Sequence, residues 1–94
     1  MTKLPSPSEL LIPMITAINV NGGQLHHKEI EIHIADSLQI PDSLRTLIRS
    51  GRRTELNYRL SWARTKAKNL GYLEKLSAGN WSLTESGKNY LAQI

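Results

Sequence analysis

A stretch without glycine or proline, Glu55 to Leu70, is the sequence feature that most constrains the fold. Its apolar residues recur at helical spacing, which favours a helix over a strand. On a helical wheel they share an arc of about 80°, a narrow seam suited to packing against a core. Thr54 is a suitable cap before this stretch, and Gly71 is a suitable stop after it. We therefore predict one long helix with a single buried face, formed by Leu56, Leu60, Ala63, Ala67 and Leu70.

The pattern changes after this helix from helical spacing to alternation. Tyr72 to Leu76 and Asn80 to Leu83 form two short alternating segments that flank Ser77-Ala78-Gly79. Such a pair predicts an antiparallel hairpin, and we place its turn at Gly79-Asn80. Trp81 alternates with Leu83 and is expected to face the core with it.

A first helix has a recognisable start and end near the N-terminus. Ser6 is placed to cap it, Pro7 suits its first position, and Glu9 completes a capping box. Pro13 falls inside the apolar pattern, so it is expected either to kink this helix or to begin its main segment. Asn21-Gly22-Gly23 is expected to end it, because glycine accepts the left-handed conformation of a C-terminal cap.

The middle of the chain is ambiguous. Alternating isoleucines within His27 to Leu38 fit a strand, but Ile30, Ile34 and Leu38 also fit a helix, which we prefer. Ile40-Pro41 then breaks the pattern. Leu44 to Ile48 is predicted to form one or two further helical turns that end at Ser50-Gly51.

The order of these elements indicates the fold class. Thr84 is placed to cap a last helix from Glu85 to about Ala92. The order is then helix, helix, long helix, hairpin, helix, without repeats or a linker, in one domain covering residues 1–94. We predict a mainly α domain with a small β-hairpin, the order found in winged helix-turn-helix domains, where the hairpin is the wing.

Charge is distributed unevenly along the chain. Residues 1–44 carry 2 basic and 5 acidic side chains, whereas residues 45–94 carry 10 basic and 3 acidic ones. Nine of the 12 lysines and arginines fall between Arg45 and Lys75. This asymmetry favours a polyanionic partner for the second half.

The long helix is the natural candidate for reading that polyanion. Its face opposite the apolar seam combines hydrogen-bonding, cationic and aromatic side chains, which suit base edges in a major groove. Arginines just before it are placed to hold phosphates at the helix start, and a lysine follows on the wing. Two alternatives to base contact stay open. In one, the Trp62 ring is half-buried against the preceding segment; in the other, Asn57 hydrogen-bonds the turn before the helix. The candidate DNA-binding residues are Arg49, Arg52, Arg53, Thr54, Asn57, Tyr58, Ser61, Trp62, Arg64, Thr65, Lys68 and Lys75.

Catalytic and metal chemistry find no support in the sequence. Cysteine is absent, which excludes disulfides, thiol nucleophiles and cysteine-based zinc sites. His26, His27 and His33 have no evident further ligand, and no glycine-rich phosphate loop or serine nucleophile motif is present. We therefore expect a non-catalytic domain without metal or cofactor. The apolar runs are shorter than the roughly 20 residues of a membrane helix, so no membrane partner is expected. The absence of cysteine fits a cytoplasmic location, which we expect.

Several stretches together resemble one family. They are Ser50 to Thr54, Asn57 to Thr65 and Leu70 to Glu74, with Leu10 to Ile15 near the start and Trp81 to Gly87 near the end. In these stretches the chain resembles the N-terminal domain of Mrr-type restriction proteins. The Trp-Ala-Arg-Thr stretch with its upstream Ser-Gly-Arg is the more specific part.

The resemblance implies a winged helix that binds double-stranded DNA for a modification-dependent restriction system. Cutting in that family belongs to a separate nuclease domain, so no cleavage is expected of this chain, whether that nuclease lies in the same or another chain. Sensing of methylated DNA would fall to Trp62 or Tyr58. The alternative is a winged helix used for protein–protein contact, through the acidic first half or the wing. One observation distinguishes DNA binding from protein–protein contact. Internal ion pairs at the arginines would count against DNA binding; these arginines are Arg52, Arg53, Arg59 and Arg64. The sequence leaves the oligomeric state open.

Overall fold

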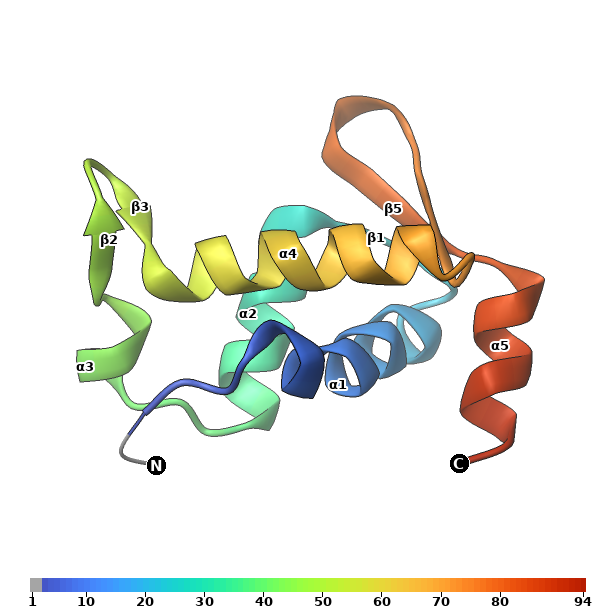
Figure 1. Ribbon diagram of the computed structural model, residues 1–94, viewed down its shortest axis with the longest axis horizontal. Helices are drawn as coiled ribbons and strands as arrows, with labels where there is room; N and C mark the ends of the chain where they lie inside the picture. The colour runs from blue at the N-terminus through green and yellow to red at the C-terminus, as the bar shows by residue number, and fades with distance from the viewer. Residues whose placement is uncertain (1–2) are drawn as a thin grey trace.

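Three helices form the body of the protein. In the computed structural model, which describes residues 3–94, α1 (Pro7–Val20), α2 (His27–Ser37) and α4 (Glu55–Asn69) pack around one core (Figure 1). Helices dominate, and only small antiparallel sheets accompany them. No helix among the described residues is long and apolar enough to cross a membrane. The largest fully buried side chains all come from these helices: Leu10, Met14, Ile15, Ile18, Ile30, Ile34, Leu56 and Leu60.

The capping residues expected for α1 are confirmed. Ser6 Oγ accepts from the Glu9 backbone N–H at 3.2 Å, and Glu9 Oε1 accepts from the Ser6 N–H at 3.0 Å. The helix runs continuously from Pro7, so Pro13 is not its start. Pro13 lies inside this helix and is half-buried; because proline has no backbone N–H, it cannot donate to the Glu9 carbonyl one turn earlier. Gly23 N–H closes the helix on the Ile18 carbonyl at 2.9 Å.

The helical interpretation of the second segment is also confirmed. Ile30 and Ile34 of α2 are fully buried, whereas Ile32 between them is 51% exposed. A strand would place all three on one face, so this burial follows helical spacing. The helix is capped by His26, whose Nδ1 accepts from the Lys28 N–H at 3.1 Å.

The prediction of further helical turns from Leu44 to Ile48 is wrong. Only one turn forms, α3 (Asp42–Arg45), and the chain then enters a hairpin of β2 (Ile48–Ser50) and β3 (Arg53–Thr54). Ser50-Gly51 does not end a helix, because Ser50 is the last residue of β2 and Gly51-Arg52 is the turn of this hairpin. Gly51 has a φ of +54°, a left-handed conformation that glycine adopts without strain.

The second sheet contains the predicted hairpin and one strand that we did not predict. Its order is β1 (Gln24–His26), β5 (Asn80–Leu83), β4 (Leu73–Lys75), all antiparallel. The turn is the short 3-10 segment η1 (Ser77–Gly79), so the prediction of a turn at Gly79-Asn80 is one residue late. The turn needs left-handed residues at Ala78 and Gly79, which leaves Asn80 to begin β5. The final helix, α5 (Glu85–Ala92), is confirmed with Thr84 as its cap.

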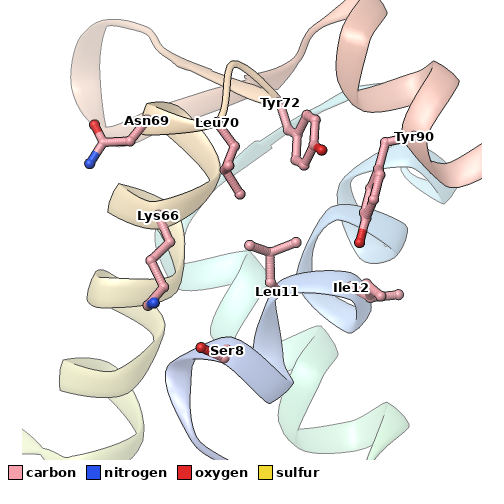
Figure 2. Close-up of a pocket in the computed structure, with 8 residues that line it drawn as sticks. All are labelled: Ser8, Leu11, Ile12, Lys66, Asn69, Leu70, Tyr72 and Tyr90. Atoms are coloured by element: carbon pink, nitrogen blue, oxygen red, sulfur yellow. The ribbon is translucent and has the colours of Figure 1, made fainter.

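The predicted buried face of α4 is correct except at its end. Leu56, Leu60, Ala63 and Ala67 are buried, but Leu70 is 58% exposed. The helix ends at Asn69, so Leu70 lies beyond the core and lines an open groove between α1, α4 and α5 (Figure 2). The stacked rings of Tyr72 and Tyr90, 4.5 Å apart, form part of the same groove. The inward orientation of Trp81 and Leu83 is confirmed, since both are buried.

Candidate nucleic-acid interface

The outer face of α4 lies between two projecting hairpins. The β2–β3 hairpin rises at its N-terminal end and the β4–β5 hairpin at its C-terminal end, both on the side away from α1 (Figure 1). The opposite face of the helix is buried in the core through Leu56, Leu60 and Ala63. The face predicted to contact DNA is therefore the open one, bounded at each end by a hairpin.

Two aromatic rings lie on this outer face. Trp62 is 49% exposed and meets the ring of Tyr58 edge-on, with centroids 6.5 Å apart. Tyr58 is half-buried because the Arg49 guanidinium stacks on its ring at 3.5 Å from the centroid. The more accessible of the two rings is therefore Trp62.

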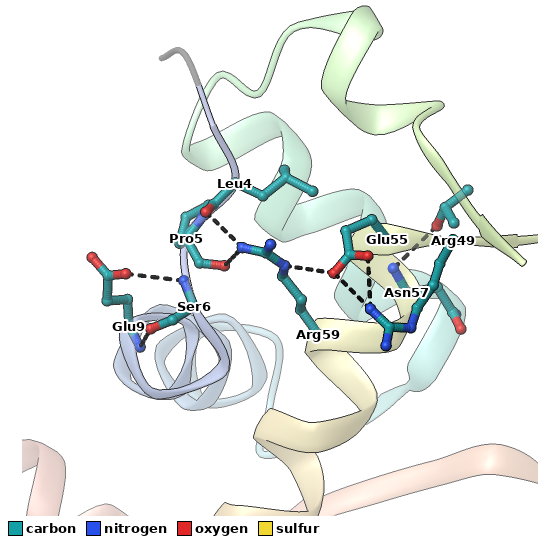
Figure 3. A network of polar contacts seen from close by, with 9 residues as sticks. Leu4, Pro5, Ser6, Glu9, Arg49, Glu55, Asn57 and Arg59 are labelled. Atoms are coloured by element: carbon teal, nitrogen blue, oxygen red, sulfur yellow. Dashed lines mark hydrogen bonds and ion pairs between the residues drawn. The ribbon is translucent and has the colours of Figure 1, made fainter.

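Two arginines near the start of α4 are held internally (Figure 3). Arg59 Nε donates to Glu55 Oε2 at 2.8 Å, and its Nη1 donates to the carbonyls of Leu4 and Pro5 at 2.8 and 3.1 Å. Arg49 Nη1 donates to Glu55 Oε1 at 3.1 Å. The hydrogen bond from Arg59 is the main reason that the pKa of Glu55 lies below its ordinary value, and Arg49 adds to it. These contacts fasten the N-terminal segment and the β2–β3 hairpin to α4.

The other two arginines of this hairpin remain exposed. Arg52 and Arg53 take part in none of the ion pairs found among residues 3–94. Arg53 Nε donates to Asn57 Oδ1 at 3.0 Å, and Asn57 Nδ2 donates to Glu31 Oε1 of α2 at 3.1 Å. Asn57 therefore joins α4 to both neighbouring elements, and its amide is already occupied on both sides.

The hydroxyl groups of the outer face are partly engaged. Thr54 Oγ1 accepts from the Asn57 backbone N–H at 3.1 Å as the cap of α4, and Thr65 Oγ1 donates to the Ser61 carbonyl at 3.1 Å. Lys68 and Lys75 are exposed, the first near the end of α4 and the second on β4. The structure thus brings predicted residues together in two places: one hollow is lined by Arg52, Arg53, Thr54 and Asn57, and a second one, beside the β4–β5 hairpin, by Ser61, Thr65, Lys68 and Lys75.

Arg64 departs from this arrangement. Its side chain is only 9% exposed and lies over the Trp81 ring, with Cζ 5.6 Å from the centroid. It lines a cleft between α4 and the β4–β5 hairpin, and Ser61, Thr65 and Lys68 of the outer face line the rim of the same cleft. Helical spacing alone placed it beside that face, because the wheel does not show which positions the hairpin covers.

The histidines do not gather further metal ligands. His26 and His27 stack with ring centroids 4.4 Å apart, and His26 Nδ1 is used as the cap of α2. Within residues 3–94, no group of three histidine, cysteine, aspartate or glutamate side chains is arranged to hold a metal ion.

The sequence matches one family model. The model of the Mrr N-terminal domain matches residues 8–93, nearly the whole chain. The chain is a member of the Mrr N-terminal domain family. Membership in this family suggests a restriction-system domain, as the resemblance implied. Comparisons with curated proteins and with solved structures give no match.

The sequence patterns did not predict two features of this Mrr N-terminal domain. The β2–β3 hairpin positions Arg49 on Tyr58, and β1 extends the sheet beside His26 and His27. Gly51 with its flanking polar residues was the available signal for the first hairpin. Strands of two or three residues carry too little alternation to be recognised.

Proposed function

We propose that this protein is a winged helix-turn-helix domain that binds double-stranded DNA for a restriction system, with α4 in the major groove and the β4–β5 hairpin as the wing. The observation that carries the proposal is the open face of α4, set between two hairpins that each present exposed cations. A 15-residue helix is about 22 Å long, and a major groove about 12 Å wide admits one helix.

Electrostatics support this proposal. The acidic residue at the start of α4, Glu55, is neutralised by Arg49 and Arg59, whereas Arg52 and Arg53 stay exposed at the hairpin tip. Lys68 supplies charge at the other end of the helix. Cations at both ends of a reading helix suit the phosphates that border the groove.

Within this proposal, Trp62 is the residue for sensing a modified base. Its exposed ring offers an apolar contact for a base methyl group in the major groove. Tyr58 contributes indirectly, because Arg49 covers its face and its ring packs edge-to-face with Trp62. The domain has no nuclease role of its own in this proposal, and cleavage would come from a nuclease domain in the same or another chain.

Fluorescence anisotropy with one duplex, unmodified or carrying methylated adenine or cytosine, tests the proposal at two salt concentrations. We expect salt-sensitive binding, a preference for one modified duplex, and loss of that preference in Trp62→Ala. Lys88→Ala, on α5 away from this face, is the control and should keep the preference for the modified duplex. Equal binding to all duplexes would remove the sensing role, and no binding at low salt would contradict DNA binding itself.

A protein-docking role is the second candidate. Its supporting observation is the apolar groove of Figure 2, about 400 Å³ in volume and lined by Leu11, Leu70 and Tyr90 among others. The groove lies outside the face between the hairpins, so docking there is compatible with DNA binding. Failure of DNA binding at low salt would leave docking as the better proposal.

A further inference from the structure

The residues that line the cleft beside Arg64 favour the binding of an anion. It lies between one stripe of α4 and the inner side of the β4–β5 hairpin and encloses about 480 Å³. Arg64, Lys68 and Lys75 supply cations, and no carboxylate lines it. The full lining is His27, Ser61, Arg64, Thr65, Lys68, Asn69, Lys75, Gly79 and Trp81.

The Arg64 guanidinium is the unusual group in this cleft. Its Nε is buried and has no hydrogen-bond partner within residues 3–94, and Arg64 takes part in none of the ion pairs found there. Glu31 attracts it electrostatically, but one oxygen of that carboxylate already accepts from Asn57. Burial lowers the pKa of Arg64, yet an arginine stays charged at neutral pH. A buried charge without a partner is costly, so this position favours a bound counter-charge.

The register of the hairpin places the second cation. Lys75 lies directly opposite Trp81 in the β4–β5 ladder. Directly paired residues of an antiparallel ladder point to the same face of the sheet, so Lys75 shares the side on which Trp81 packs against Arg64. Lys68 follows Arg64 by one helical turn on the same face of α4. The three cations therefore approach the cleft from two elements.

We propose that this cleft is a phosphate-binding site anchored by Arg64, with Lys68 and Lys75 as flanking cations. The source of the phosphate rests on the proposed function: in a duplex complex, a backbone phosphodiester enters the cleft between α4 and the wing. The alternative source of the same chemistry is a free phosphate ion. Arginine forms directed hydrogen bonds to phosphate oxygens through its guanidinium N–H groups, and a phosphate in the cleft would supply the counter-charge that Arg64 lacks.

Two matched variants test the site with DNA. Arg64→Met removes the buried charge and keeps a flexible, unbranched side chain. Lys66→Met removes the same charge from the same helix, but Lys66 lies at the groove on the other side (Figure 2). With a duplex that lacks terminal phosphates, we expect Arg64→Met to bind about tenfold more weakly and to lower the salt slope by about one unit. Lys66→Met should change affinity less than about twofold. Equal affinities for the two variants would exclude a backbone phosphate from the cleft.

Titration of the wild-type protein with inorganic phosphate tests the site independently of DNA. The ¹⁵N–¹H signal of Arg64 Nε should shift saturably with phosphate and not with sodium chloride at equal ionic strength. A shift together with the DNA effect supports a backbone phosphate. A shift without the DNA effect supports the site and assigns it to free phosphate, even if the protein binds no duplex. No saturable shift would overturn the proposal, and this outcome does not depend on the folding of any variant.

Discussion

At the residue scale, two buried residues show how the hairpin and the last helix pack against the rest of the protein. Arg64 lies over Trp81, and Gly87 of α5 is buried against the chain that leaves α4. A Cβ added at Gly87 would lie 2.5 Å from the Tyr72 carbonyl oxygen and 2.6 Å from Leu83 Cδ1. Glycine is therefore needed here for close packing rather than for a turn.

Gly87→Ala tests this close approach. Alanine is the better helix former by about 1 kcal/mol, but the Cβ collides with backbone that has little room to move. We expect a net loss of about 1–3 kcal/mol in the free energy of unfolding, measured by urea denaturation. Ser86→Ala, exposed on the same helix, should change it by less than about 0.5 kcal/mol. Equal stability of both variants would contradict the packing argument.

At the scale of elements, caps and short polar contacts join segments that would otherwise move separately. Thr84 Oγ1 accepts from the Gly87 N–H at 3.1 Å and donates to the Gly71 carbonyl at 2.5 Å. One hydroxyl thus starts α5 and ties it to the end of α4. Arg59 does the same for the N-terminal segment, which it fastens to α4 through the Leu4 and Pro5 carbonyls.

Thr84→Val removes the hydroxyl and keeps the shape of the side chain. Both hydrogen bonds are lost, so we expect a loss of about 1–2 kcal/mol in the free energy of unfolding. Amide hydrogen exchange should rise first in α5, because its cap is removed. Thr16→Val, exposed on α1, is the matched control and should leave both measurements near the wild type. Unchanged exchange in α5 would show that this cap does not hold the helix.

The β2–β3 hairpin gives a second prediction at this scale. Its exposed arginines suit phosphates, so the pair Arg52→Ala and Arg53→Ala should weaken binding of all duplexes alike. Ser61→Ala should instead change which DNA sequence is preferred. Asn57 is the less suitable residue for this test, because its amide already forms hydrogen bonds with Arg53 and Glu31. Competition between duplexes of different sequence measures both effects. A uniform loss in Ser61→Ala would count against base reading by α4.

At the scale of the whole molecule, the protein has an acidic first half and a basic outer face. If about five phosphates are neutralised, the plot of log affinity against log salt should have a slope of about −4.5. Anisotropy titrations at four salt concentrations measure it. A slope near zero would contradict binding through the phosphate backbone.

Stability should fall with decreasing pH in two steps. Burial, with a contribution from neighbouring His26, lowers the pKa of His27 below its ordinary 6.5, and hydrogen bonds lower that of Glu55 below 4.5. In both cases the unfolded chain binds protons at a higher pH than the folded one. The stabilisation is therefore complete above the unfolded pKa and is lost as pH falls through the folded pKa. Urea midpoints between pH 7.5 and 3.5 should decline, and His27→Gln should remove the first step only. A midpoint that rises as pH falls from 7 to 5 would contradict this sign.

The sequence alone determined the features that depend on neighbours a few residues apart. The capping box of Ser6 and Glu9, the helical spacing of α4 and the family resemblance were all predictable, because hydrogen bonds and periodicity of this kind are local. Only the tertiary structure decided which positions are covered. Arg64 is buried because the hairpin folds Trp81 onto it, and Leu70 is exposed because its helix ends where the core does. Burial depends on contacts between distant segments, which no local pattern contains.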